Sequence, residues 1–264
     1  MTPTPLPHAT SRARFGGKAA ALAEALAAGL PVPDGLALEV ELVEAICAGA
    51  TGTEAGWLES LGGTAAVRSS AVDEDGAQAS FAGQHLTVLG VRRATDLLDA
   101  VRDVHASAHE PSVLAYRARL GIAGPPRIAV VLQRMLEPRC AGVLFTRHPV
   151  TGNDERLIEA SWGVGEAVVS GLVEPDRVRM RRGGEVIEQH VGVKDVAIRA
   201  AEHGMTETAV DEADRSRPCL DAEDLAALEG LAARCESAVP GAHDIEWAFV
   251  GRHLFLLQRR DVTR

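Results

Sequence analysis

Four polar residues near the C-terminus form two pairs with the same spacing, one of two acidic residues and one of an amide and an arginine. Asp244 and Glu246 occupy alternate positions in one apolar run, and Gln258 and Arg260 do so at the end of the next. Successive side chains of a strand point to opposite faces, so each pair shares a face. A carboxylate and an amide oxygen that meet across strands can bind Mg²⁺, and a neighbouring guanidinium can stabilise a phosphoryl group in transfer. The alternative is a solvated sheet face with one Asp244–Arg260 ion pair.

The pairing of these groups depends on the loop between the two runs. A three-residue loop at residues 251–253 sets Glu246 opposite Gln258 and Asp244 opposite Arg260. A two-residue loop would shift the register by one residue and separate Glu246 from Gln258. We therefore predict a three-residue loop. In that register four large apolar side chains face the core: Trp247, Phe249, Phe255 and Leu257.

Lysine is rare in this chain, because only Lys18 and Lys194 are lysines among 27 basic residues. An ammonium is more compact than a guanidinium, so these lysines are candidates for positions that arginine does not fit. Lys18 follows two glycines at the start of an Ala/Leu-rich run that is typical of a helix ending before Gly29. Such a helix start favours anions, although the spacing is not that of a P-loop. An ordinary helix start is the alternative.

A second candidate phosphate ligand is Arg68, which follows an apolar run and is expected to project from the end of a sheet. Residues 71–84, which come next, are small and acidic and are typical of a loop. A loop that follows such an arginine is a candidate lid over a phosphate site. An ordinary surface loop is the alternative.

The rest of the chain alternates helical and strand-like patterns around a Gly/Pro-rich break at residues 121–126, where we place a lobe boundary. We predict an irregular leader at 1–14, a first lobe at 15–122 and a second lobe at 123–264. Residues 192–220 are expected to be irregular. Helices are predicted at about 39–48, 54–60, 95–106, 111–120 and 221–239, and strands at 127–135, 141–146, 156–159, 176–180 and 185–191.

Bulk composition excludes several classes of function. The net charge of −10 argues against sequence-independent binding of nucleic acid, which needs clustered positive charge. No run is long and apolar enough for a membrane span or a secretory signal. The four cysteines lie far apart and form no CxxC pair, which favours a reducing compartment and a cytoplasmic protein.

The order of several motifs resembles one family over nearly the whole chain. The segments are 16–19, 29–35, 66–70, 79–84, 133–135, 142–152, 159–171, 174–176, 244–248 and 257–260. They are similar to the N-terminal nucleotide-binding domain of phosphoenolpyruvate synthase and pyruvate phosphate dikinase, a branch of the ATP-grasp architecture also found in rifampicin phosphotransferase. The resemblance implies an α+β, two-lobed ATP-grasp-like fold, with mixed, largely antiparallel sheets flanked by helices.

The resemblance also implies a role for each candidate residue. ATP would lie between the lobes, with Ser80–Gln84 as its lid and Lys18, Arg68 and Arg260 as the catalytic cations. The implied contacts are Lys18 and Arg68 with the phosphates, Gln133, Met135 and Leu136 with adenine, Glu246 and Gln258 with Mg²⁺, and Arg260 with the transferring phosphoryl group.

Departures from the family pattern limit the function. His148 stands where Asn or Asp usually precedes Pro149, and Asp261 replaces a proline after Arg260. The family's swivelling phosphohistidine domain and pyruvate-binding barrel are missing, and none of the nine histidines lies in a phosphocarrier motif. We therefore do not expect the chain alone to convert pyruvate to phosphoenolpyruvate.

Two classes of function follow from these observations. The first is an ATP- and Mg²⁺-dependent phosphotransferase whose acceptor is a small molecule or the histidine of a separate carrier protein. The second is a non-catalytic nucleotide-binding subunit with a regulatory or structural role. We favour the enzyme because every candidate ATP-contacting residue is retained. A domain excised from a longer protein is a third interpretation.

Overall fold

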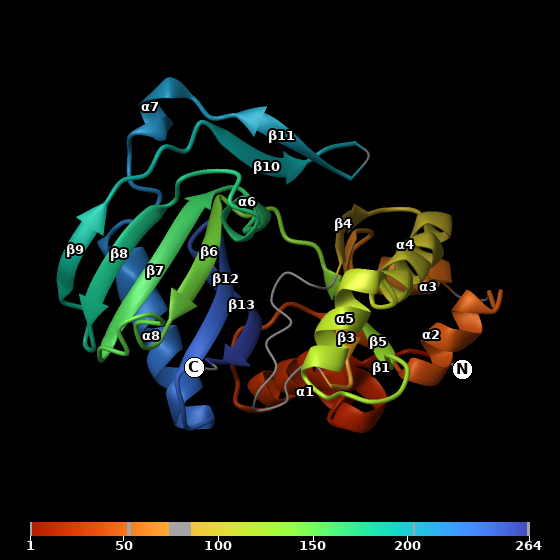
Figure 1. Ribbon diagram of the computed structural model, residues 1–264. Helices are drawn as coiled ribbons and strands as arrows, with labels where there is room; N and C mark the ends of the chain where they lie inside the picture. Colours follow the sequence, from red (N-terminus) through yellow and green to blue (C-terminus); the bar gives the residue numbers. More distant parts are fainter. Residues whose placement is uncertain (1, 52–53, 74–85, 203, 263–264) are drawn as a thin grey trace.

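The computed structural model describes residues 2–51, 54–73, 86–202 and 204–262. Two antiparallel sheets dominate it, and Figure 1 shows them beside each other with helices on both. One sheet has the strand order β1-β2-β5-β3-β4, and the other has the order β13-β12-β6-β7-β8-β9. The predicted lid at Ser80–Gln84 lies outside the described residues.

The first lobe is built on a five-stranded sheet with β3 and β5 adjacent in its interior. Helices α2 and α4 share an apolar core with one face of this sheet, and α1 packs against β3 and β5. The strands are β1 (Thr4–Pro5), β2 (Gly35–Leu38), β3 (Ala65–Ala71), β4 (Thr87–Val91) and β5 (Ile128–Arg134). The helices are η1 (Leu6–His8), α1 (Arg12–Ala27), α2 (Val40–Cys47), α3 (Glu54–Ser60), α4 (Ala94–Ser107) and α5 (Pro111–Arg119).

Strand pairing moves two of the predicted boundaries. β5 pairs with β2 and β3, so the chain leaves the first sheet after Arg134 and not at residue 122. The Gly/Pro-rich break at 121–126 is a connection within this lobe. The leader is also less irregular than expected, because Thr4–Pro5 pairs with β2 and the apolar side chains of Leu6 and Ala9 are fully buried.

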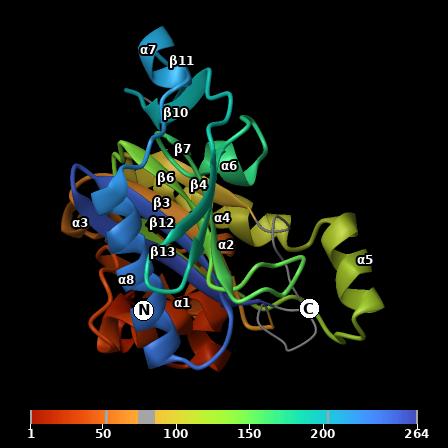
Figure 2. The ribbon, with the colours of Figure 1, turned by 90° about the vertical axis from the view of Figure 1, so that its left-hand side faces the viewer.

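The second lobe is a six-stranded sheet with α8 beside it, as Figure 2 shows. Helix α8 begins at a capping box between Asp221 and Asp224, which satisfies backbone N–H groups at its start. The strands are β6 (Cys140–Phe145), β7 (Glu155–Trp162), β8 (Asp176–Arg181), β9 (Val186–His190), β12 (His243–Val250) and β13 (His253–Asp261), and the helices are α6 (Glu166–Val169) and α8 (Ala222–Ala238).

Residues 192–220 are more ordered than the sequence predicted. They contain a two-stranded antiparallel ribbon of β10 (Val196–Ala200) and β11 (Met205–Ala209), followed by α7 (Glu212–Arg215). Lys194 precedes this ribbon, and its fully buried side chain forms an ion pair with Asp176. Asp176 also accepts hydrogen bonds from the backbone N–H groups of Gly192 and Cys219. Asp176, at the start of β8, therefore holds together the segments around Gly192, Lys194 and Cys219 inside the second lobe.

A buried arginine ties α8 to its sheet. Arg156 on β7, 1% exposed, contacts Glu229 and Glu236, and Arg182 pairs with Glu236 from the other side. Burial alone would raise the pKa of Glu236, but the hydrogen bonds from both arginines outweigh it and lower the pKa from 4.5 to about 2.

Helix α1 joins the two lobes. Besides the first sheet it contacts β13, and its apolar face belongs to the same core as Ile245 and Trp247. Polar contacts reinforce this connection, because the guanidinium of Arg259 pairs with Glu24 and the N–H of Leu256 donates to the carbonyl of Pro31 at 2.9 Å. The two lobes therefore share one hydrophobic core, in which α1 packs against the second sheet. None of the helices in the described parts of the chain is long and apolar enough to cross a membrane.

Candidate functional site

The hairpin of β12 and β13 has a different loop from the one predicted. Val250 pairs with His253, so the loop has two residues, and the prediction of three was wrong. Glu246 nevertheless pairs with Gln258, because β13 contains one extra residue between Leu256 and Gln258. This β-bulge restores the register that the short loop would have shifted.

The two-residue loop also changes which apolar side chains face the core, because it pairs Phe249 with Leu254 and Trp247 with Leu256 before the bulge is reached. Leu254 and Leu256 pack there with Trp247 and Phe249, whereas Phe255 and Leu257, which we had assigned to the core, are only partly buried. The carbonyl oxygen of Leu257 accepts a hydrogen bond from Arg68 at 2.7 Å. A bulge leaves its extra residue outside the ladder, so this carbonyl is available to a side chain from the other lobe.

A cavity of about 450 Å³ lies between the lobes and collects all eight predicted site residues. It is lined from the first lobe by Lys18, Arg68, Gln133, Met135 and Leu136, and from the second by Glu246, Gln258 and Arg260. The start of α1, two central strands, the segment after β5 and the bulged hairpin thus all line one cavity. The structure establishes that these residues lie together, while their individual roles stay predictions.

Arg68 lines this cavity from the middle of β3 and not from a sheet end as predicted. Its side chain is only 9% exposed. Nη1 donates to Gln133 Oε1 at 3.0 Å, and Nη2 donates to Glu246 Oε2 at 2.7 Å and to Gln258 Oε1 at 2.9 Å. Because those acceptors come from both lobes, Arg68 is a polar bridge across the cavity.

Lys18 reaches the cavity because the chain turns sharply before it. Gly16 has φ 76° and ψ 175°, a conformation that essentially only glycine adopts, so the long helical run starts after it. Ser70 holds this turn, since its hydroxyl donates to the carbonyl of Phe15 at 2.6 Å and accepts from the N–H of Ala19 at 3.0 Å. The Lys18 ammonium donates to the carbonyl of Ser69 at 2.7 Å.

Asp244 is a member of this cluster that we had treated only as an ion-pair partner. Its Oδ2 lies 3.1 Å from Arg260 Nη2, which is also 3.5 Å from Glu246 Oε1. Burial is the main reason that the pKa of Asp244 rises from 3.8 to about 6; the charge of Glu246 adds to the rise and that of Arg260 opposes it. The alternation of Asp244 with Glu246 was the sequence signal for this placement.

Glu166 is a cavity residue that the sequence reasoning missed. It begins α6 and lines the cavity from the second lobe. Burial raises the pKa of its carboxyl, and the charge of Glu246 raises it further. The only signal was its position after the Gly163–Gly165 turn, which brings the chain back to the cavity.

The donor set of the cavity fits a nucleotide and its metal. Gln133 Nε2 and Asp244 Oδ1 are buried and have no hydrogen-bond partner among the described residues, and buried polar atoms normally have one. No group of three His, Cys, Asp or Glu suited to a metal occurs in the described ranges. Glu246 and Gln258 would therefore need further oxygen ligands, such as phosphate oxygens, to complete the shell of Mg²⁺.

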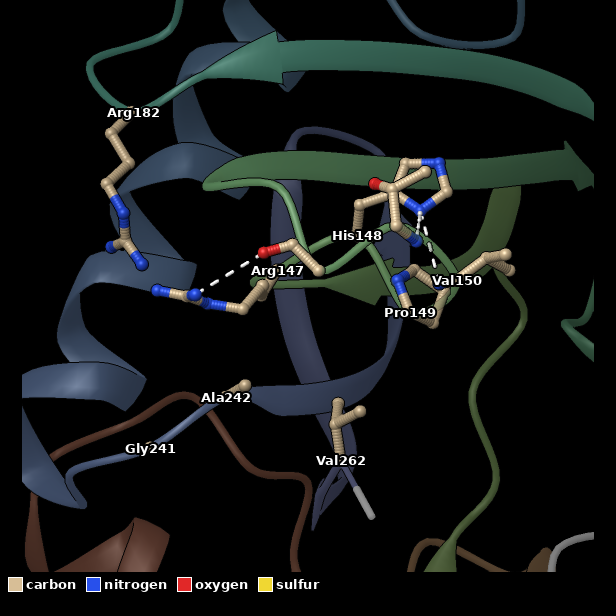
Figure 3. Close-up of a pocket in the computed structure, with 10 residues that line it drawn as sticks. Arg147, His148, Pro149, Val150, Arg182, Gly241, Ala242 and Val262 are labelled. Atoms are coloured by element: carbon tan, nitrogen blue, oxygen red, sulfur yellow. Dashed lines mark hydrogen bonds between the residues drawn. The ribbon is translucent and has the colours of Figure 1, made fainter. Parts of the chain in front are cut away.

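A larger hollow of about 870 Å³ lies elsewhere on the second lobe, and Figure 3 shows the residues around it. Its two arginines, Arg147 and Arg182, both contact Asp154, so their charge is largely compensated. His148 forms the rim, where its Nδ1 accepts from the N–H groups of Val150 and Thr151 at 3.2 and 3.3 Å. An Asn or Asp oxygen commonly makes this turn contact, and here the imidazole of His148 makes it.

The second departure, Asp261, has a small structural effect. It is the last residue of β13 and pairs with His243, so the strand continues one residue past Arg260. Its carboxylate is 75% exposed and lies 3.3 Å from His243 Nδ1.

Two sheet-based lobes around a polar cavity define an ATP-grasp-like protein, the fold class that we predicted. A Pyrococcus horikoshii protein of known structure has a similar overall fold, with a TM-score of 0.50 at 15% identity over 98% of this chain and 96% of that one. Residues 39–264 match the model of the pyruvate phosphate dikinase AMP/ATP-binding domain. The chain belongs to that family.

The chain is similar to one part of several longer proteins. It is 40% identical over 200 residues to a probable phosphoenolpyruvate synthase of Methanothermobacter thermautotrophicus, a match that covers 75% of this chain and 29% of that protein. It is 38% identical over 201 residues to a rifampicin phosphotransferase of a Streptomyces species, which covers 75% and 23%. The chain thus spans less than a third of the length of either relative.

Proposed function

We propose that the protein is an ATP- and Mg²⁺-dependent phosphotransferase domain that binds ATP in the cavity between its lobes. The observation that carries this proposal is the convergence of Lys18, Arg68 and Arg260 with Glu246 and Gln258 on one cavity. Phosphoryl transfer depends mainly on positioning and on neutralising charge, and this cluster provides cations and hard oxygen ligands together.

The residues that line the cavity form two groups, one for the base of the nucleotide and one for its phosphates and metal. Met135 and Leu136, beside Gln133, offer an apolar edge and a free amide donor for the base. Lys18 and Arg68 bind and orient the phosphates, and Arg260 faces the phosphoryl group in transfer. Glu246 and Gln258 would hold Mg²⁺, which when bound neutralises phosphate charge.

The acceptor is a small molecule or the histidine of a separate carrier protein. One relative is named a probable phosphoenolpyruvate synthase and the other a rifampicin phosphotransferase, and the second name supports a small-molecule acceptor. A cytoplasmic location agrees with the free state of all four cysteines.

Labelled ATP tests the proposal directly. Purified protein with Mg²⁺ should release labelled ADP or AMP, or transfer label to an added carrier or acceptor. Glu246→Gln and Arg260→Ala should each lower turnover by about 100-fold, because each removes a charge-stabilising group. Arg252→Ala is the matched control, since Arg252 lies in the same hairpin but pairs with Asp221 outside the cavity.

The alternative of a nucleotide-binding subunit makes a different prediction. Such a protein would be stabilised by ATP against thermal unfolding and yet be inert with every acceptor tried. Absence of both ATP-dependent stabilisation and turnover would refute either function.

A further inference from the structure

Arg68 places one cationic group between the two residues proposed to hold the metal. Its Nη2 donates to Glu246 Oε2 at 2.7 Å and to Gln258 Oε1 at 2.9 Å. A hard cation bound by this pair would use the same carboxylate and amide oxygens. The guanidinium therefore stands in the position that a metal ligated by both residues would need.

The other half of the guanidinium holds it there. Nη1 donates to Gln133 Oε1 at 3.0 Å and to the bulged carbonyl of Leu257 at 2.7 Å. Each Nη atom carries two hydrogens, so all four are engaged. Three of the four acceptors belong to the second lobe, and the charged group is therefore fixed across the cavity.

Electrostatics makes this arrangement unfavourable for a free divalent cation. The other oxygen of Glu246 lies 3.5 Å from Arg260 Nη2, so the carboxylate is already shared by two guanidinium groups. A metal ion entering beside Arg68 would meet a like charge at short range in a largely buried site, where repulsion is weakly screened. Only the removal of Arg68 frees both oxygens together.

We infer that Arg68 is a positioning residue that excludes divalent metal from Glu246 and Gln258 until an anion draws it away. A nucleotide phosphate is such an anion, because a guanidinium binds phosphate oxygens in a bidentate, charge-assisted way. Metal and nucleotide then enter as coupled ligands, and the same movement releases the contact with Leu257 between the lobes. Both the metal-binding role of Glu246 and Gln258 and the identity of the anion rest on the proposed function.

Mn²⁺ binding in the absence of nucleotide tests the inference. The full chain is titrated with Mn²⁺ alone, and free Mn²⁺ is followed by electron paramagnetic resonance. Arg68→Met should bind Mn²⁺ at least about tenfold more tightly than wild type, since a factor of ten needs only about 1.4 kcal/mol. Adding Glu246→Gln to that variant should abolish the gain, which assigns it to this pair.

The matched control is Arg260→Met. It removes one guanidinium beside Glu246 and changes the net charge equally. Among the described residues Arg260 contacts Asp244 and Glu246 but not Gln258, so this variant should leave much of the exclusion in place. Gln133→Leu is a second, charge-neutral variant that removes only one acceptor of Arg68 and should tighten Mn²⁺ binding by a few fold. It keeps the test available if Arg68→Met does not fold.

Thermodynamic linkage gives an independent measure. ADP should tighten Mn²⁺ binding in wild type, and by reciprocity Mn²⁺ should tighten ADP binding equally. This coupling should shrink in Arg68→Met by the factor that the variant gains without nucleotide. Equal Mn²⁺ affinity in wild type, Arg68→Met and Gln133→Leu, or an equal gain in Arg260→Met, would overturn the inference. Because the first titration contains no ATP, its result stands apart from any failure of phosphotransfer.

Discussion

Replacing Gly16 by alanine should destabilise the protein because a Cβ atom has no room there. An added Cβ would lie 2.0 Å from the carbonyl oxygen of Ser70, and the glycine has φ +76°. The backbone conformation costs an L-residue roughly 1–3 kcal/mol, and forcing extra volume into packed structure costs roughly 1–3 kcal/mol more. We expect Gly16→Ala to lower the free energy of unfolding by about 3 kcal/mol.

Gly29→Ala separates the two contributions. Gly29 also has positive φ, at +71°, but the nearest atom to its added Cβ is Arg234 Nη2 at 4.0 Å. This variant should lose only the conformational part, about 1 kcal/mol. Urea unfolding followed by tryptophan fluorescence measures both values. Equal losses in the two variants would refute the assigned close approach of Gly16 to Ser70.

Three further predictions concern the second lobe. The folded-state pKa of Glu236 is depressed to about 2, so the carboxylate stabilises the fold fully above its unfolded pKa near 4.5, and this stabilisation is lost as the pH falls towards 2. After discounting for solvent screening, the stabilisation is roughly 1–2 kcal/mol. The free energies of unfolding of wild type and Glu236→Gln, measured in urea, should therefore converge between pH 5 and 2. Lys194→Met should cost roughly 3–5 kcal/mol because it leaves Asp176 buried and unpaired, whereas Arg181→Met, which breaks an exposed pair, should change thermal stability little. Asp221→Ala removes the cap of α8 and should cost about 1 kcal/mol in the same denaturation assay.

The closing hairpin shows which part of a site a sequence can predict. Alternation along the strands predicted which polar side chains share a face, and the predicted pair of Glu246 with Gln258 forms although the loop from which we derived it is different. The loop was wrong because we chose its length from the register alone and placed Gly251 in a three-residue loop, whereas its φ of +58° suits the first position of a two-residue type II′ turn. The compensating bulge has no local signature, since it is favoured by contacts of Leu257 with the other lobe.

The lobe boundary failed for a related reason. The apolar run at 127–135 was recognisable as a buried strand, but nothing within it specifies its neighbours. β5 joins β2 and β3 through pairing with segments tens of residues away, and such pairing is decided by the packing of both faces. A Gly/Pro-rich break marks a turn in the chain, whereas a lobe boundary depends on where the core is shared.

We placed Arg68 at the end of a sheet because it follows an apolar run, but it lies in the middle of β3. A guanidinium in a central strand is tolerated only if its charge is compensated, because a buried unpaired charge is costly. Glu246 supplies that compensation from the opposite lobe at 2.7 Å. Under the proposed function, the contact that stabilises Arg68 inside β3 would have to break when a phosphate binds, so its strength would help to set the affinity of the cavity for phosphate. A cation compensated by protein on one side and by ligand on the other can exchange partners without ever being left unpaired, and this makes a buried position suitable for a phosphate-binding arginine.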